Sequence, residues 1–328
     1  MPKSGWLTLL QIGKEAGFGS PQDVVYTLPL INDVSIGPIA PNAISSGLVR
    51  DGSCVELEEY QGLDADITAA PTKAGGRKLV ALTGAQCGLS PRVCQWLFRG
   101  LVQSSATAGA GSDLTQALDY ATGATTQWYT IAKQMGLTAS HSLRAVGCVI
   151  NRIAIDCPAN GAGTITFDAI GKDETIHTGV ASTAALTDTV LCTKDATFKW
   201  DGDALGPISF NLEFNNNASP VFVDSDTCDA ILVGPLNITG SVTCEHVEQI
   251  AKTQVDARTG LVKTVQIYWG TTGNDGYLEF GFDAKIVPTP SQTEADNFQQ
   301  LTVNFEGKVK NTAGESWDVQ SNDAEAFS

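Results

Sequence analysis

The chain has 328 residues, enough for two domains of ordinary size, each with its own core. Its 20 basic and 36 acidic residues give a net charge of −16. This charge excludes a nucleic-acid-binding protein, because phosphate binding needs clustered lysine and arginine. Only 17% of the residues are charged and glycine is abundant, at 33 residues, so the composition favours sheets joined by turns over helix bundles.

The chain contains no apolar run of about 18 residues, so it predicts no membrane-spanning helix. Residues 1–13 have only a brief apolar stretch, too short for a secretory signal, and folding in the cytosol of the producing cell is expected. Glycine and proline punctuate residues 1–22, which predicts an extended N-terminal arm rather than core.

Short strands are expected next, at 24–30 and 32–36, with Pro29 favouring an edge position. Residues 55–58 alternate apolar and acidic side chains with period two, as a half-buried strand does. A turn at 71–76 then leads into a strand at 79–83, which predicts a hairpin.

The strongest helix signal follows this strand. Ser90 can cap the helix and Pro91 suits its first position, while apolar side chains recur on one face. Residues 104–126 are mostly Ser, Ala, Gly and Thr and predict an insertion with no core of its own. Strands are then expected at 129–133, 146–155 and 164–170.

A second series follows a polar linker at 175–190. Phe210, Leu212 and Phe214 alternate with Ser209, Asn211 and Glu213, which indicates a strand with one buried face. A strand at 236–243 runs into a helix signal that begins at Cys244. Further strands are expected at 265–269, 277–286 and 301–305, before a polar tail at 311–328.

Both halves therefore show the order strand, helix, strand, strand, strand. The offsets between matching segments are 156, 136 and 137 residues, and the drop of about twenty fits the single insertion at 104–126. The sequence predicts a mainly β protein with two tandem β-sandwich or barrel domains, at 23–174 and 191–310, each flanked by one α-helix.

No pattern indicates catalysis, a cofactor or a metal. The eight cysteines form no C-x-x-C pair, and Cys228, Cys244 and His246 lack an evident fourth ligand, so buried thiols are favoured. None of the three histidines pairs with a nucleophile by spacing, and no nucleotide-binding or hydrolase motif occurs. Glu58 and Glu59 are adjacent on a strand and point to opposite faces, which disfavours a glycosidase pair.

The order of several segments resembles the major tail tube proteins of long-tailed bacteriophages. The resemblance covers most of the chain and is carried by residues 14–21 (KEAGFGSP), 208–216 (ISFNLEFNN), 236–243 (LNITGSVT) and 277–290. It implies small β-sandwich or barrel domains that pair sheet edges around a ring. It also implies stacked rings that form a channel for DNA, as in the inner tubes of contractile tails and type VI secretion machines.

The same resemblance implies a non-enzymatic virion protein that is assembled in the host cytoplasm. Its expected partners are further copies of itself, the tail terminator, tape measure and distal tail proteins, and phage DNA that passes without sequence recognition. A duplicated domain could close a pseudo-six-fold ring with three chains, although a hexamer of chains remains open.

Carboxylates that line such a channel would repel phosphate, so DNA would slide rather than stick. The candidates for this lining are Glu56, Glu58, Asp64, Asp66, Asp224, Asp226 and Asp229. The last three superficially resemble a calcium loop but lack its glycine and its terminal glutamate. The alternative is that all seven face bulk solvent.

A second function from a different class is a two-domain β-sandwich that binds glycans on a virion surface, like an adhesin. Trp269, Trp317 and Tyr268, which are expected to be exposed, would then form a platform for sugar stacking.

Overall fold

The computed structural model describes residues 8–22, 26–31, 35–38, 79–102, 127–135, 142–177, 184–185, 189–222, 228–245, 262–271, 276–287, 291–295, 298–308 and 318–321. Over these ranges the protein is mainly β, so the expected fold class is confirmed. Within the same ranges, no helix is long and apolar enough to cross a membrane.

The first half of the chain contributes β1 (Thr8–Lys14), β2 (Tyr26–Leu28), β3 (Ser35–Pro38), β4 (Val80–Gly88), α2 (Pro91–Val102), β5 (Tyr129–Met135), β6 (Ser142–Cys157), β7 (Thr164–Gly171), β8 (Asp173–His177) and β9 (Ala184–Ala185). The second half contributes the 3₁₀ helix η2 (Thr193–Asp195), β10 (Ala196–Trp200), β11 (Asp203–Leu205), β12 (Pro207–Asn215), β13 (Ser219–Val221), β14 (Ala230–Leu232), β15 (Asn237–Glu245), β16 (Val262–Trp269), β17 (Leu278–Ile286), β18 (Ser291–Ala295), β19 (Phe298–Lys308) and β20 (Asp318–Ser321).

The two halves pair their strands in the same order. In the first half the order is β3-β4-β7-β6-β5-β1-β2, and β8 pairs with β6. In the second half it is β12-β15-β19-β17-β16-β10-β11, and β20 pairs with β17. Every pairing in both series is antiparallel. The same topology is therefore built twice, and each strand of the first series has a counterpart in the second.

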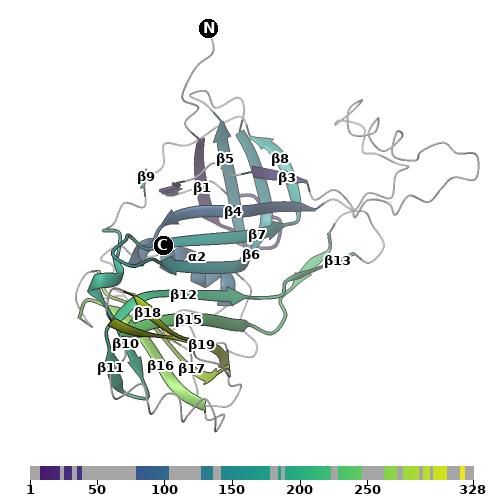
Figure 1. Ribbon diagram of the computed structural model, residues 1–328. Helices are drawn as coiled ribbons and strands as arrows, with labels where there is room; N and C mark the ends of the chain where they lie inside the picture. The colour runs from purple at the N-terminus through teal and green to yellow at the C-terminus, as the bar shows by residue number, and fades with distance from the viewer. Residues whose placement is uncertain are drawn as a thin grey trace, which may run out of the picture.

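The two halves are joined through one more strand pair, β6 with β12 (hereafter the internal joint). Its register runs from Phe210 opposite Cys157 to Asn215 opposite Arg152. The joint makes one central sheet in the order β3-β4-β7-β6-β12-β15-β19-β18, and Figure 1 shows β4, β7, β6, β12 and β15 following one another down the molecule. Backbone hydrogen bonds therefore run from one repeat into the next without interruption.

One face of this central sheet carries the core. Along β12 the buried side chains are Phe210, Leu212 and Phe214, and the residues between them are more exposed. The strand β7 alternates in the same way, with Ile165 and Phe167 fully buried. Apolar side chains from both halves form a single buried cluster, because the sheet and its covering layer are continuous across the joint.

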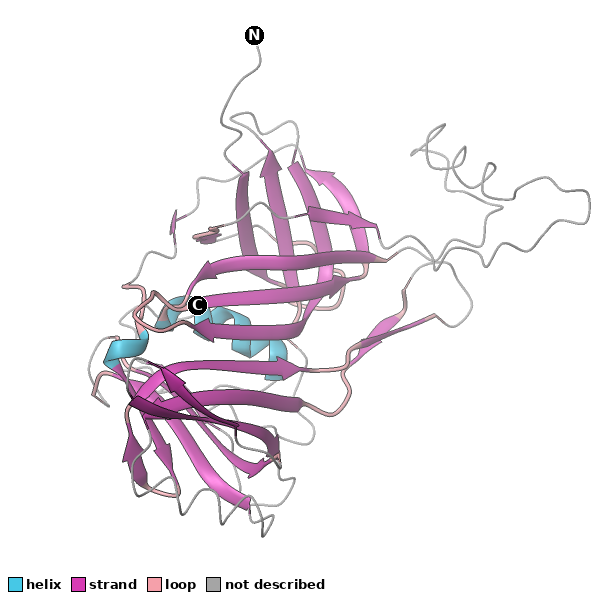
Figure 2. Ribbon diagram, viewed as in Figure 1, coloured by secondary structure: helices cyan, strands magenta, loops and turns pink. Residues whose placement is uncertain are grey.

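Helix α2 lies against this buried face, between the strands of the two halves (Figure 2). It begins as expected, at Pro91, and the Ser90 hydroxyl accepts a hydrogen bond from the Val93 amide at 3.4 Å. Phe98 belongs to the first half but packs against Phe214 and Phe280 of the second, with ring centroids 5.0 and 5.4 Å away. A helix that serves both halves must be buried nearly all round, and this one is.

A buried amide ties the end of α2 to the internal joint. The Nδ2 of Asn216, which is 1% exposed, donates hydrogen bonds to the carbonyl oxygens of Leu101 and Ile150. Leu101 stands at the C-terminal end of α2, where helix carbonyls lack partners within the helix. Asn216, which directly follows β12, therefore satisfies two buried acceptors and links the end of the helix to β6.

The N-terminal segment differs from the expected arm. Strand β1 pairs with β2 and β5, and Leu10 and Ile12 are fully buried, so Thr8–Lys14 is part of a core sheet. Glu15, 3% exposed, accepts hydrogen bonds from the Thr130 hydroxyl (2.7 Å) and the Gly147 amide (2.9 Å). Burial raises the pKa of the Glu15 carboxyl. The glycines at 13, 17 and 19 suggested an extended arm, but the apolar residues of β1 form a strand between β2 and β5.

The expected C-terminal tail also contains structure, because β20 pairs with β17. The expected linker contains the end of β8 and the short strand β9, which pairs with β2. The predicted insertion at 104–126, the strand and hairpin between 55 and 76, and the second helix after Cys244 lie outside the described residues.

Candidate functional site

The face of the central sheet opposite the core carries mostly polar side chains. Because side chains alternate along each strand and pair across strands, the register places them on one face. We call this surface the polar sheet face. It consists of Gln86, Arg152, Ala154, Asp156, Thr164, Thr166, Asp168, Ser209, Asn211, Glu213, Asn215, Asn237, Thr239, Ser241, Thr243, Thr302, Asn304 and Glu306.

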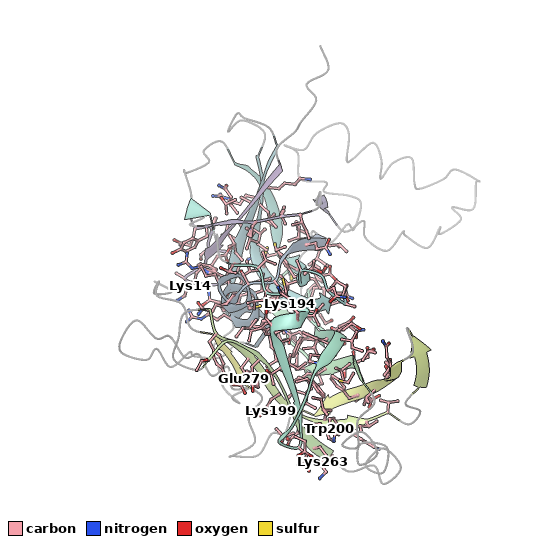
Figure 3. The ribbon with its side chains drawn as sticks, turned by 60° about the vertical axis from the view of Figure 1, so that its left-hand side comes forward. Lys14, Lys194, Lys199, Trp200, Lys263 and Glu279 are labelled. Atoms are coloured by element: carbon pink, nitrogen blue, oxygen red, sulfur yellow. The ribbon has the colours of Figure 1, made fainter. Side chains whose placement is uncertain are left out.

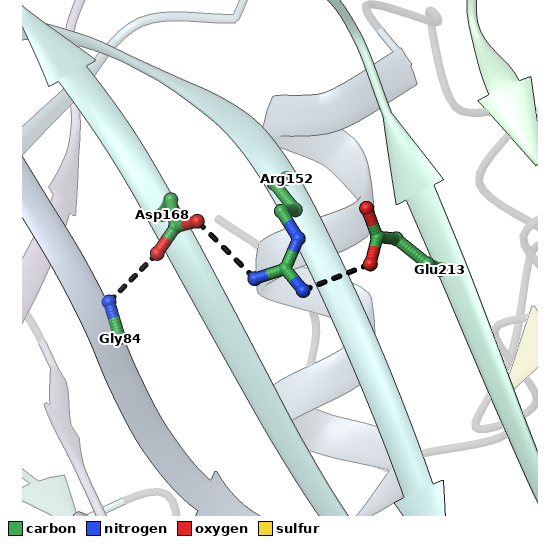
Figure 4. A network of polar contacts seen from close by, with 4 residues as sticks. All are labelled: Gly84, Arg152, Asp168 and Glu213. Carbon is green, nitrogen blue, oxygen red and sulfur yellow. Dashed lines mark hydrogen bonds and ion pairs between the residues drawn. The ribbon is translucent and has the colours of Figure 1, made fainter.

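A charged network crosses the internal joint on this face. Arg152 of β6 lies 3.4 Å from the Asp168 carboxylate of β7 and 2.8 Å from the Glu213 carboxylate of β12, and Asp168 accepts a hydrogen bond from the Gly84 amide (Figure 4). The hydrogen bond with Arg152 lowers the pKa of Glu213 and raises that of Arg152. One base therefore pairs with carboxylates from both halves of the chain.

Uncharged polar pairs continue the face on both sides of that network. The Asn211 amide donates to the Ser241 hydroxyl at 2.9 Å, and the hydroxyls of Thr243 and Thr302 lie 2.9 Å apart. The pattern is one of hydroxyls and amides that hydrogen-bond each other across strands. Such a surface is wetted by water and offers no apolar platform to a ligand.

The charge of the polar sheet face is negative. It carries the carboxylates of Asp156, Asp168, Glu213 and Glu306, against the single base Arg152 among its defined members. Lysines elsewhere are spread over the molecule, from Lys14 in β1 to Lys263 in β16 (Figure 3). Lys263 is itself paired with Asp201 at 2.6 Å. The described surface therefore repels phosphate along its sheet and offers no basic stripe.

The buried cysteine thiols are part of the apolar core. Cys87, Cys157 and Cys244 are buried, and burial raises the pKa of each thiol to about 12, so they are protonated and unreactive at neutral pH. Cys228 and Cys244 belong to different apolar clusters, and His246 lies outside the described residues. The described part of the chain contains no group of His, Cys, Asp or Glu arranged to hold a metal.

Six of the seven carboxylates predicted to line a channel, Glu56, Glu58, Asp64, Asp66, Asp224 and Asp226, lie outside the described residues. The seventh, Asp229, is exposed beside the small β13–β14 hairpin, and its amide donates to the Val221 carbonyl at 2.9 Å. Its neighbours in the chain do not belong to the polar sheet face. The prediction for these seven residues stays a prediction.

Sequence reasoning missed the network of Arg152, Asp168 and Glu213. The alternation at 209–214 did place Glu213 on the outer face of its strand, so the position of this one member could be predicted. The pairing of β6 with β12 brings Arg152 and Glu213, which are 61 positions apart, into contact, and no local sequence pattern predicts this pairing.

Trp269 is not available for the sugar-stacking platform of the alternative function. Trp269 is 1% exposed, and its indole nitrogen donates to the Cys192 carbonyl at 2.9 Å. Tyr268 is half-buried with Lys199 above its ring at 4.9 Å, and Trp317 lies outside the described residues. The expectation that Trp269 is exposed was wrong, because period-two alternation turns it to the core side of β16.

The described residues thus form a duplicated β-module, joined edge to edge, with a polar and anionic outer sheet. Residues 5–308 match the family described as phage tail tube protein, and the chain belongs to that family. The resemblance inferred from the sequence is thereby confirmed. Among curated proteins, the comparison finds no match.

Membership makes the protein a structural component of the virion tail, from a family not known for enzymatic activity. It also implies assembly into a tube with copies of itself and with other tail proteins.

Proposed function

We propose that three copies of the chain close into a ring of six similar modules, and that stacked rings form a hollow conduit for phage DNA. The internal joint carries this proposal. It shows that one module can bind the next edge to edge through backbone hydrogen bonds, so a closed ring repeats a contact that the chain already makes once.

We infer further that the polar sheet face lines the channel. Its side chains hydrogen-bond among themselves, and its net charge is negative, so DNA would meet a hydrated surface that holds no phosphate. The seven carboxylates named from the sequence remain candidates for the same lining. The tape measure protein would occupy this channel before ejection, and terminator and distal tail proteins would cap the two ends of the tube after assembly in the host cytoplasm.

Electron microscopy of the purified full chain tests the assembly. We expect rings or filaments of uniform width with a hollow centre, and a mass per ring equal to three chains. A preparation that stays monomeric at all concentrations would contradict the proposal, and a ring with the mass of six chains would reject the trimer.

Cysteine labelling tests the lining. Asn304 is exposed on the polar sheet face, so Asn304→Cys should react with a bulky polymer-linked maleimide in the unassembled chain and lose that reaction in tubes. A small maleimide supplies the control, because it should reach the same residue in both states. Full reaction of assembled tubes with the bulky reagent would place this face on the outside.

A further inference from the structure

The two strands of the internal joint, β12 and β6, have counterparts at the ends of the central sheet, and each counterpart has one edge that no described strand pairs with. Strand β12 pairs with β15 on one side and β6 on the other, whereas its counterpart β3 pairs, among the described strands, with β4 alone. These edges lie at opposite ends of the central sheet, which begins at β3 and ends at β18. Unpaired edges present rows of amide and carbonyl groups that can bind another strand.

Strand β18 is the counterpart of the part of β6 that forms the joint. The β4–β7 ladder ends at Thr164 and Gly171, and the β15–β19 ladder has Gln300 and Gly307 at the matching ends, a spacing of 136 residues in both cases. On that spacing Ile150 of β6 matches Ile286, the last residue of β17.

Beyond Ile150, β6 shows an irregularity and continues along β7. Beyond Ile286, the Val287 amide still donates to the Asn304 carbonyl at 2.9 Å, and β18 then resumes the pairing with β19. The stretch of β6 that binds β12 therefore has β18 as its equivalent in the second half.

We propose that β3 of one copy pairs antiparallel with β18 of the neighbouring copy, and that this contact closes the ring. The inference rests on the proposed ring and names the strands that join it. Transferring the register of the internal joint places Ser35 opposite Thr293 of the neighbour, as Asn211 stands opposite Asp156 within the chain. Each copy then uses each edge once, which gives a head-to-tail contact that closes on itself.

An exposed apolar side chain stands next to the proposed seam. Ile31 is 58% exposed, although its amide donates to the Gln86 carbonyl and so continues the β3–β4 pairing. The corresponding stretch of the second half, between Pro207 and Ser209, holds Ile208, which is only partly exposed beside the internal joint. On the register above, Ile31 lies just beyond Ala295, the last residue of a neighbouring β18.

The test is a double variant, Ser35→Cys with Thr293→Cys, in the full chain under mild oxidation. Both template residues, Asn211 and Asp156, are exposed, so the engineered thiols should meet on an accessible face. We expect covalent dimers and closed trimers on a non-reducing gel, with tubes still visible in the microscope. The variant Asn211→Cys with Asp156→Cys is the positive control, because it should cross-link within one chain.

A mismatched pair, Ser35→Cys with Asn211→Cys, should give no specific intermolecular product. Tubes that form without cross-linking of Ser35→Cys to Thr293→Cys would overturn the β3–β18 contact and leave the tube intact. A chain that forms neither rings nor tubes, while its internal control still cross-links, would overturn the proposed function and this contact together.

Discussion

The two faces of the internal joint differ in what they contribute. One face buries Phe214 and Ile155, with Phe214 packed on Phe98 of α2, whereas the other carries the partly exposed Arg152 and Glu213. The same two strands supply both faces, since successive side chains alternate. Burial of large apolar side chains contributes several kcal/mol each, and exposed ion pairs contribute little. The buried face therefore stabilises the internal joint, while the exposed face carries the charged network.

Truncating the aromatic core under the joint should give the largest effect. Phe214 is fully buried and its ring lies 5.0 Å from Phe98 and 6.0 Å from Phe280. We expect Phe214→Ala to lower the free energy of unfolding by about 3–5 kcal/mol, through lost burial and a cavity. Chemical denaturation measures this, with Asn211→Ala on the exposed face as control. Equal losses in the two variants would contradict the division between faces.

Adding one methyl group to α2 should also destabilise the buried side. A Cβ at Gly100 would lie 2.7 Å from Ile150 Cγ1 and would touch the Tyr129 ring, both buried. Alanine normally stabilises a helix over glycine by about 1 kcal/mol. We nevertheless expect Gly100→Ala to cost about 1–3 kcal/mol in thermal or denaturant unfolding, because overpacking outweighs helix propensity.

Combining Gly100→Ala with Ile150→Ala, which removes the crowded Cγ1 atom, should cost less than the sum of the two single substitutions. If Gly100→Ala alone raises the melting temperature, α2 is not packed as closely on β5 and β6 as described.

Breaking the charge network should have a small effect on folding. Arg152 bridges Asp168 and Glu213, but its side chain is 34% exposed and that of Glu213 39%. Solvent screens such pairs, so Arg152→Gln should cost at most about 1 kcal/mol and less in high salt. Unfolding in low and high salt measures this. A salt-independent loss as large as that of Phe214→Ala would show that the network is part of the core.

The smallest effect is a change in the pH dependence of stability. Arg152 holds the pKa of Glu213 below its ordinary value of 4.5, so the folded state favours the ionised carboxylate. This contribution is present above pH 4.5 and is lost as the pH falls through the lowered pKa. Glu213→Gln should therefore flatten the acid side of the stability curve, measured by unfolding from pH 6 downward. An unchanged acid slope would show that Glu213 is not held by Arg152.

Buried Glu15 should act in the opposite direction to Glu213. Burial raises its pKa, so its folded form prefers the proton, and its ionisation reduces stability as the pH rises above 4.5. Measurement of Glu213→Gln should therefore use the wild-type Glu15 background, in which this opposing slope is constant.

Several features could be predicted from the sequence because they depend on local periodicity. The alternation at 209–214 gave the buried and exposed faces of β12, and Ser90 with Pro91 gave the start of α2. Residues 8–14 were misread because glycines at 13, 17 and 19 outweighed two apolar positions. In the fold, Leu10 and Ile12 fill the core between β2 and β5.

The sequence by itself determined that this protein is mainly β, that its elements recur twice in order, and that it resembles tail tube proteins. These conclusions follow from side-chain periodicity and segment order, which each stretch of chain carries on its own. Only the tertiary structure decided that β6 pairs with β12, that Arg152 joins carboxylates from both halves, and that Trp269 is buried. Strand pairing is made by backbone groups common to all residues, so which edges meet is settled by the packing of the whole chain.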